Sequence, residues 1–142
     1  MRLISVLPML ALVVCSACAS TAPTATPAQL RTFGRGLEEC DKLVLNFYAL
    51  REGLQIDGPE LTEIVKAMSP DNLAPWGNYS KFGIYGPMTF YAKGRAICVM
   101  EYCVDSIVGR DEGGDVVYVK LKSDTILPVL KRFGIQTEPP SV

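Results

Sequence analysis

The sequence predicts an α+β domain: two N-terminal helices, an antiparallel meander of about four strands, and a C-terminal helix packed on one sheet face. Three observations predict this order. Apolar residues recur every three or four positions between residues 33 and 68, a β-favouring run covers residues 95–108, and an amphipathic stretch closes the chain. Of the 142 residues, we assign 33–136 to this single domain and expect 137–142 to be a disordered tail.

Two helices are predicted at the start of the domain. The first covers about residues 36–51, where apolar side chains recur at helical spacing. Its apolar stripe is formed by Phe33, Leu37, Cys40, Val44 and Phe47. The second begins at Asp57, a residue type that caps helices, and continues through Pro59 and Glu60 to about Met68.

The strands are predicted from alternating apolar and polar residues. They cover about residues 81–85, 88–92, 95–108 and 117–121, with turn residues such as Gly86-Pro87 between them. The face of the long third strand that we expect toward the core carries Ala96, Cys98, Met100, Tyr102, Val104, Ser106 and Val108. A strand of that length is expected to contain a bulge or bend, which would invert this assignment partway along.

The last predicted helix follows Asp124, which can cap it, and ends at Gly134. Its buried face is expected to consist of Ile126, Val129, Leu130 and Phe133. Truncation of Phe133 to alanine should therefore cost about 3–5 kcal/mol of stability.

The N-terminus has the three-part pattern of a secretory signal. Arg2 is followed by an apolar stretch and then by small residues. The stretch is shorter than the roughly 20 apolar residues of a membrane-spanning helix. We assign residues 1–17 to the signal peptide and residues 18–32 to a flexible Ala/Thr/Pro linker. The protein is therefore expected to be exported to a bacterial cell envelope, facing the periplasm.

Two processing routes remain open. Ser16-Ala17-Cys18 resembles the end of the lipobox of bacterial lipoprotein precursors. This resemblance implies that Cys18 is lipidated, and that the membrane is then a partner through the lipid anchor. Alternatively, Ala17-Cys18-Ala19 fits an ordinary signal peptidase, and cleavage after Ala19 would give a soluble periplasmic or secreted protein.

The domain contains three cysteines, Cys40, Cys98 and Cys103. Export would place them in an oxidising compartment, where pairing is expected. Cys98 and Cys103 point to opposite faces of one strand, whereas Cys40 lies on the apolar stripe that should cover Cys98. We therefore predict a Cys40–Cys98 disulfide. A Cys40–Cys103 bond, a bond between Cys98 and Cys103, and free thiols stay open.

The absence of histidine is the most informative chemical property of the chain. It excludes Ser-His-Asp and Cys-His systems, histidine zinc sites and haem held by histidine. Glu101 and Asp105 would lie about 13 Å apart on one strand, beyond the roughly 5–9.5 Å of paired catalytic carboxylates. Asp111, Glu112 and Asp115 do not match a calcium loop. We expect no metal, no cofactor and, without a basic stripe, no nucleic-acid partner.

The two leading helices and the spacing of Phe47-Tyr48 and Met68-Ser69-Pro70 resemble nuclear-transport-factor-like cone folds. This resemblance implies at most a pocket between the sheet and the helices. The aromatic residues that could line a ligand pocket are Trp76, Tyr79, Tyr85 and Tyr91.

These observations favour a non-enzymatic envelope lipoprotein that binds another envelope protein or supports an assembly. One alternative is a periplasmic small-ligand-binding protein with an aromatic-lined pocket. The other is a carboxylate-dependent hydrolase, which the spacing of Glu101 and Asp105 disfavours.

Overall fold

The computed structural model describes residues 24–76, 84–103 and 105–135. The predicted signal peptide (1–17), Cys18, the first part of the predicted linker, Tyr79, Val104 and the predicted tail (137–142) lie outside the described residues. The statements that follow refer to the described part of the chain.

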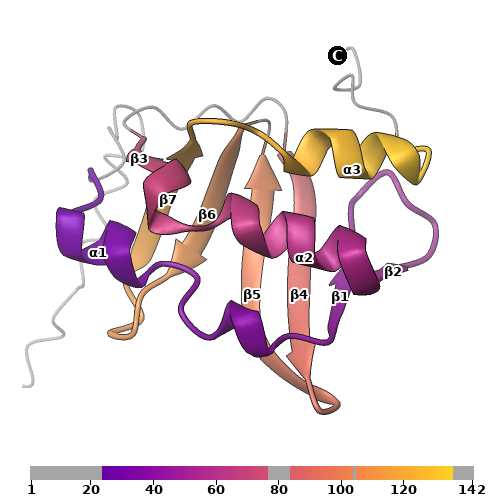
Figure 1. Ribbon diagram of the computed structural model, residues 1–142. Helices are drawn as coiled ribbons and strands as arrows, with labels where there is room; N and C mark the ends of the chain where they lie inside the picture. The colour runs from indigo at the N-terminus through magenta and orange to yellow at the C-terminus, as the bar shows by residue number, and fades with distance from the viewer. Residues whose placement is uncertain (1–23, 77–83, 104, 136–142) are drawn as a thin grey trace, which may run out of the picture.

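A seven-stranded antiparallel sheet forms the centre of the structure, in the order β2-β1-β4-β5-β6-β7-β3. Its strands are β1 (Lys42–Leu45), β2 (Leu54–Ile56), β3 (Leu73–Pro75), β4 (Ile84–Ala92), β5 (Arg95–Cys103), β6 (Ser106–Arg110) and β7 (Val116–Leu121). The described helices lie on one side of this sheet (Figure 1). They are α1 (Pro27–Thr32), α2 (Gly58–Ala67) and α3 (Ile126–Arg132), together with the short 3-10 turns η1 (Leu37–Glu39) and η2 (Pro70–Asn72).

The predicted architecture of two N-terminal helices and about four strands is wrong. In place of the first predicted helix, the chain forms η1 and then β1. Along β1, Leu43 and Leu45 are buried, whereas Lys42 and Val44 are partly exposed, which is the two-residue period of a strand. β1 pairs with β2 on one edge and with β4 on the other. Over so short a run, the spacing of the apolar residues fits a helix as well as a strand. The hydrogen bonds to strands on both edges of β1 therefore decide in favour of the strand.

The strand predicted over residues 95–108 is two strands. The chain reverses at Asp105, whose φ is 54°, so that β6 runs back along β5. Met100 and Tyr102 are buried in the core, as predicted, but Ile107 is the register partner of Tyr102 and takes the next core position. Ser106 is fully buried, as predicted. Val108 is partly exposed and pairs with Glu101, so its predicted core assignment is wrong, because the reversal inverts the faces.

Residues 81–92 were predicted as two strands separated by Gly86-Pro87, but β4 runs through this dipeptide without a break. Gly86 has φ 131°, and a Cβ atom there would lie 2.9 Å from the Cα of Phe47. The absence of a side chain at Gly86 therefore lets the backbone after β1 pass close to β4. The glycine lies at a shift in the register between β4 and β5, and the chain does not turn there.

Part of the predicted flexible linker is also ordered. Thr26 and Gln29 form a capping box at the start of α1, with bonds of 3.2 Å from the Gln29 N–H to the Thr26 hydroxyl and 2.9 Å from the Thr26 N–H to the Gln29 side chain. α2 and α3 lie where helices were predicted. Phe133, however, follows the last residue of α3 and is 39% exposed, so its predicted place in the core is wrong.

Candidate functional site

The side of the sheet opposite the helices carries apolar side chains at the surface. Along β1, β7 and the second half of β4, residues buried under the helices alternate with residues that point away from them. We name the second set the outer face; its members include Val44, Thr89, Val99, Val108, Val116 and Tyr118. Val99 is 57% exposed and Val116 is 37% exposed. No helix of the described chain covers this face (Figure 1).

The strand register places these side chains in neighbouring rows. Thr89 lies between Val44 and Val99 across three strands, and Val108 lies opposite Tyr118. Glu101 belongs to the second row, because it is the register partner of Val108, and it follows Val99 of the first row by two positions on β5. An apolar surface that crosses several strands around a polar group is typical of a site of protein interaction.

Glu101 has an aromatic neighbour on this surface. The hydroxyl of Tyr48, a residue that is 74% exposed, donates a hydrogen bond of 3.5 Å to its carboxylate. Asp105, its predicted catalytic companion, instead accepts a bond of 3.0 Å from the hydroxyl of Ser106. The two carboxylates therefore have separate partners, and their contacts do not join them into one acid–base pair.

On the inner side, three aromatic rings pack together at the C-terminal end of β5. Tyr102 lies 6.2 Å from Phe47 and 5.4 Å from Tyr85, measured between ring centroids. Its hydroxyl donates a hydrogen bond of 2.6 Å to Asp124. Burial and this bond raise the pKa of Tyr102 above its ordinary value, and burial also raises the pKa of Tyr85. Both phenols therefore stay protonated at neutral pH, and this cluster is suited to holding α3 on the sheet.

The predicted ligand-lining residues lie in different places. Trp76 packs against Tyr118, with 6.1 Å between ring centroids, and Tyr85 belongs to the inner aromatic cluster. Tyr91 lies under the ammonium group of Lys42, 4.7 Å from its ring centroid, on the outer side of the sheet. Tyr79 lies outside the described residues. The described members of this set therefore do not converge on one pocket.

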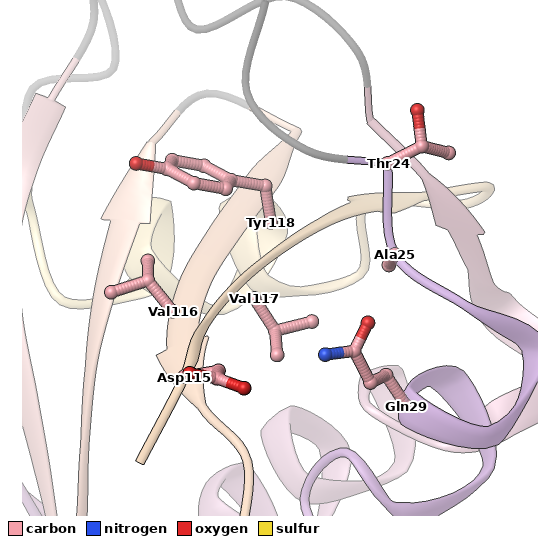
Figure 2. Close-up of a pocket in the computed structure, with 7 residues that line it drawn as sticks. All are labelled: Thr24, Ala25, Gln29, Asp115, Val116, Val117 and Tyr118. Atoms are coloured by element: carbon pink, nitrogen blue, oxygen red, sulfur yellow. The ribbon is translucent and has the colours of Figure 1, made fainter. Parts of the chain in front are cut away.

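The structure contains two hollows that are lined by residues outside this predicted set. The first, of about 340 Å³, lies between the start of the described chain and β7, where Gln29 and Val117 point toward each other (Figure 2). The second, of about 320 Å³, lies between α1 and the end of α2, and its rim carries Arg31, Arg35 and Lys66. Trp76, Tyr85 and Tyr91 line neither hollow.

Cys40, Cys98 and Cys103 are free thiols, so the predicted Cys40–Cys98 disulfide is not formed in the structure. The prediction placed Cys40 on the stripe of a helix, but in the structure Cys40 lies in the turn between η1 and β1. Burial, followed by the charges of Cys98 and Asp41, raises the pKa of Cys40 to about 11. Burial likewise raises the pKa of Cys103 to about 11. The raised pKa values keep these two thiols protonated at neutral pH, which is their weakly nucleophilic form.

The acidic loop between β6 and β7 has its own partners. Asp111 accepts hydrogen bonds from the Gln29 side chain at 3.1 Å and from the Asp115 N–H at 2.9 Å. The Gln29 bond, with further help from backbone N–H groups, lowers the pKa of Asp111 below its ordinary value. Glu112 forms an ion pair of 3.2 Å with Arg35. Within the described ranges, no group of three or more Cys, Asp or Glu residues is arranged to hold a metal ion.

No family model matches the chain, and comparison with curated proteins and with solved structures gives no match either. None of the helices in the described residues is long and apolar enough to cross a membrane. The function must therefore be inferred from the residues of this chain.

The outer face was not among the sites predicted from the sequence. A signal for it is present, because Val116, Tyr118 and Lys120 alternate with the buried Val117, Val119 and Leu121 along β7. Two of the three residues on the exposed side of β7, Val116 and Tyr118, are largely apolar. Exposed apolar residues on a strand are the pattern that could have indicated an interaction surface.

Proposed function

We propose that the protein is a non-enzymatic envelope lipoprotein whose domain binds another envelope protein through the outer face. The exposed apolar outer face is the observation that carries this proposal. Burying a fully exposed valine side chain is worth about 1.5–3 kcal/mol. Val99 and Val116 are 57% and 37% exposed, so a partner that covers them gains part of that free energy from each. Glu101, with the Tyr48 hydroxyl beside it, supplies a polar contact that fixes the orientation of the partner.

The sequence supports a position close to the membrane. Thr24, the first described residue, lies six positions after Cys18. At about 3.4 Å per residue, that segment spans at most about 20 Å. A domain tethered at Cys18 therefore remains near the membrane surface, and its partner is expected there too. The lack of histidine and the raised thiol pKa values favour binding over catalysis.

Site-directed photo-crosslinking in cells tests the binding proposal. A photoreactive residue is placed at Thr89 or Val116 on the outer face, and as a control at Lys131 on α3. We expect one discrete protein adduct from both outer-face positions and none from position 131. Val116→Lys, combined with the photoreactive residue at Thr89, should reduce the yield of that adduct severalfold.

The outcome that would overturn the binding proposal is a yield from position 131 equal to that from the outer face, or an adduct unaffected by Val116→Lys. The anchor is tested separately by Cys18→Ser, which should move the protein from the membrane fraction to the soluble fraction. Unchanged fractionation would contradict the lipid anchor but would leave the proposal of a binding surface unaffected.

A further inference from the structure

We infer that the protein bound by the outer face is acidic, and that it places Asp or Glu carboxylates on both sides of an apolar contact. The assignment rests on the proposed function, because it names the chemistry of the partner that binds there. Three properties of the outer face carry it: the sign of its charges, the lack of carboxylates beside its cations, and the contacts that hold two of those cations in position.

The strands of the sheet are basic, although the chain as a whole is slightly acidic. Acidic residues outnumber basic ones in the full sequence, 15 to 14. In the seven strands, by contrast, Glu101 is the one acidic residue, and the basic residues are Lys42, Arg95, Arg110 and Lys120. A surface that differs in the sign of its charge from the rest of the molecule attracts a partner of the opposite sign.

Two of these cations lie on either side of the exposed apolar centre. Lys42 precedes Val44 by two positions on β1, so both side chains lie on the outer side of that strand. Arg110 is the register partner of Val116. The strand order places β4 and β5, which carries Val99, between β1 and β6. Neighbouring strands are about 4.8 Å apart, so β1 and β6 are separated by about 14 Å. A partner therefore meets one cation on each side of Val99.

The outer-face cations are not neutralised within the described chain. The two ion pairs found there join the β6–β7 loop to the turn after α1, and α3 to α2, so neither involves a strand residue. Glu101 instead accepts the hydroxyl of Tyr48. The charges of Lys42 and Arg110, and of Lys120 farther along β7, are therefore available to carboxylates of a partner.

Two contacts position the cations without removing their charge. The ammonium group of Lys42 lies 4.7 Å from the ring centroid of Tyr91, and the guanidinium group of Arg110 donates a hydrogen bond of 2.8 Å to the carbonyl of Gly114. A guanidinium group has five N–H donors, so Arg110 keeps others for a carboxylate. Because both side chains are held in place before binding, less conformational entropy is lost when a partner binds them.

Two substitutions of opposite charge at one position test the sign of the partner. The photoreactive residue is kept at Thr89, and Val116→Glu is compared with Val116→Lys. With an acidic partner, we expect the adduct yield to be about threefold or more lower for Val116→Glu than for Val116→Lys. Equal yields, or the reverse order, would overturn the acidic partner and would leave the outer face as the binding surface.

Charge reversal of the two flanking cations is a second test. Lys42→Glu combined with Arg110→Glu should lower the adduct yield from Thr89 about tenfold. Lys131→Glu, the same reversal on α3, is the matched control and should leave the yield unchanged. Arg110→Lys keeps the charge and should retain most of the yield. Thermal unfolding shows that each variant is folded. A yield that falls as far with Arg110→Lys as with Arg110→Glu would contradict a role for the charge.

The crosslinked peptide of the partner, identified by mass spectrometry, shows its chemistry directly. We expect Asp and Glu to outnumber Lys and Arg in that peptide. Replacing those acids by lysine should restore the adduct with the chain that carries Lys42→Glu and Arg110→Glu. A basic peptide, or an adduct with lipid in place of protein, would overturn the acidic partner. The absence of any adduct from the wild-type outer face would overturn the proposed function, and the acidic partner with it.

Discussion

Tyr102, on the central strand of the sheet, donates a 2.6 Å hydrogen bond to the carboxylate of Asp124, which lies two residues before the start of α3. The other oxygen of that carboxylate accepts the N–H groups of Ile126 and Leu127, each at 3.1 Å. One side chain thus satisfies the first donors of α3 and joins that helix to β5. The bond therefore connects the last element of the fold to its core.

Removing the Tyr102 hydroxyl should destabilise the domain. Tyr102→Phe deletes a hydrogen bond to a charged group, which is worth about 1.5–3 kcal/mol, and leaves the packing of the ring unchanged. Tyr48→Phe is the matched control, since its exposed 3.5 Å bond should cost less than about 0.5 kcal/mol. Urea unfolding of both variants measures the difference. Equal losses in the two variants would show that the bond does not hold α3.

Stability should fall at alkaline pH. The pKa of Tyr102 is raised in the folded chain above its ordinary value of 10.0. The contribution is therefore complete below pH 10 and is lost above it, because the unfolded chain then releases a proton that the folded chain retains. One such proton gives a slope of about 1.4 kcal/mol per pH unit. In urea unfolding between pH 7 and 11.5, Tyr102→Phe should decline less steeply than wild type above pH 10, and parallel declines would refute this assignment.

Phe33 and Gly109 should be energetically coupled. A Cβ atom at Gly109 would lie 2.8 Å from the buried ring of Phe33, so Gly109→Ala forces the ring to move. Overpacking of this kind costs about 1–3 kcal/mol. The cost should shrink in a Phe33→Ala background, which a double-mutant cycle measures. Gly113→Ala, where the nearest atom is 3.4 Å away, is the control. A cost that is the same in both backgrounds would mean that the ring does not restrict position 109.

The two apolar residues at the end of α3 should differ in their importance. Leu130 is fully buried, and Leu130→Ala should cost about 2–5 kcal/mol. Phe133 is partly exposed, so Phe133→Ala should cost well under the 3–5 kcal/mol that its sequence pattern predicts. Thermal unfolding of the two variants ranks them, and a larger loss for Phe133→Ala would place it back in the core.

The sequence indicated elements with strong local signals. α2 has a proline in its first turn and a three- to four-residue apolar period, and the structure contains a helix there. Residues 42–45 were misassigned because Leu43, Leu45 and Phe47 fit a strand, whereas Cys40, Val44 and Phe47 fit a helix. Pairing with β4, more than 40 residues away in the sequence, decides between them. β2 and β3 contain three residues each, too few for any period to be read.

The candidate site was harder to predict than the elements. The outer-face positions on β6 depend on the place where the chain reverses after β5, and that reversal occurs at Asp105 with a positive φ. Aspartate is only one of several residue types that tolerate this conformation, so the turn is not visible in the sequence. Moving the reversal by one residue would exchange which of Ile107 and Val108 faces the helices. The outer face therefore follows from tertiary structure.

The mass of the N-terminal peptide of the mature protein, purified from cell envelopes, tests most directly the central claim that the domain is a lipid-anchored envelope protein. If the protein is a lipid-anchored envelope domain, that peptide begins at Cys18 and carries the additional mass of acyl chains. A peptide that begins at Ser20 without added mass, or one that retains Met1, would contradict the account.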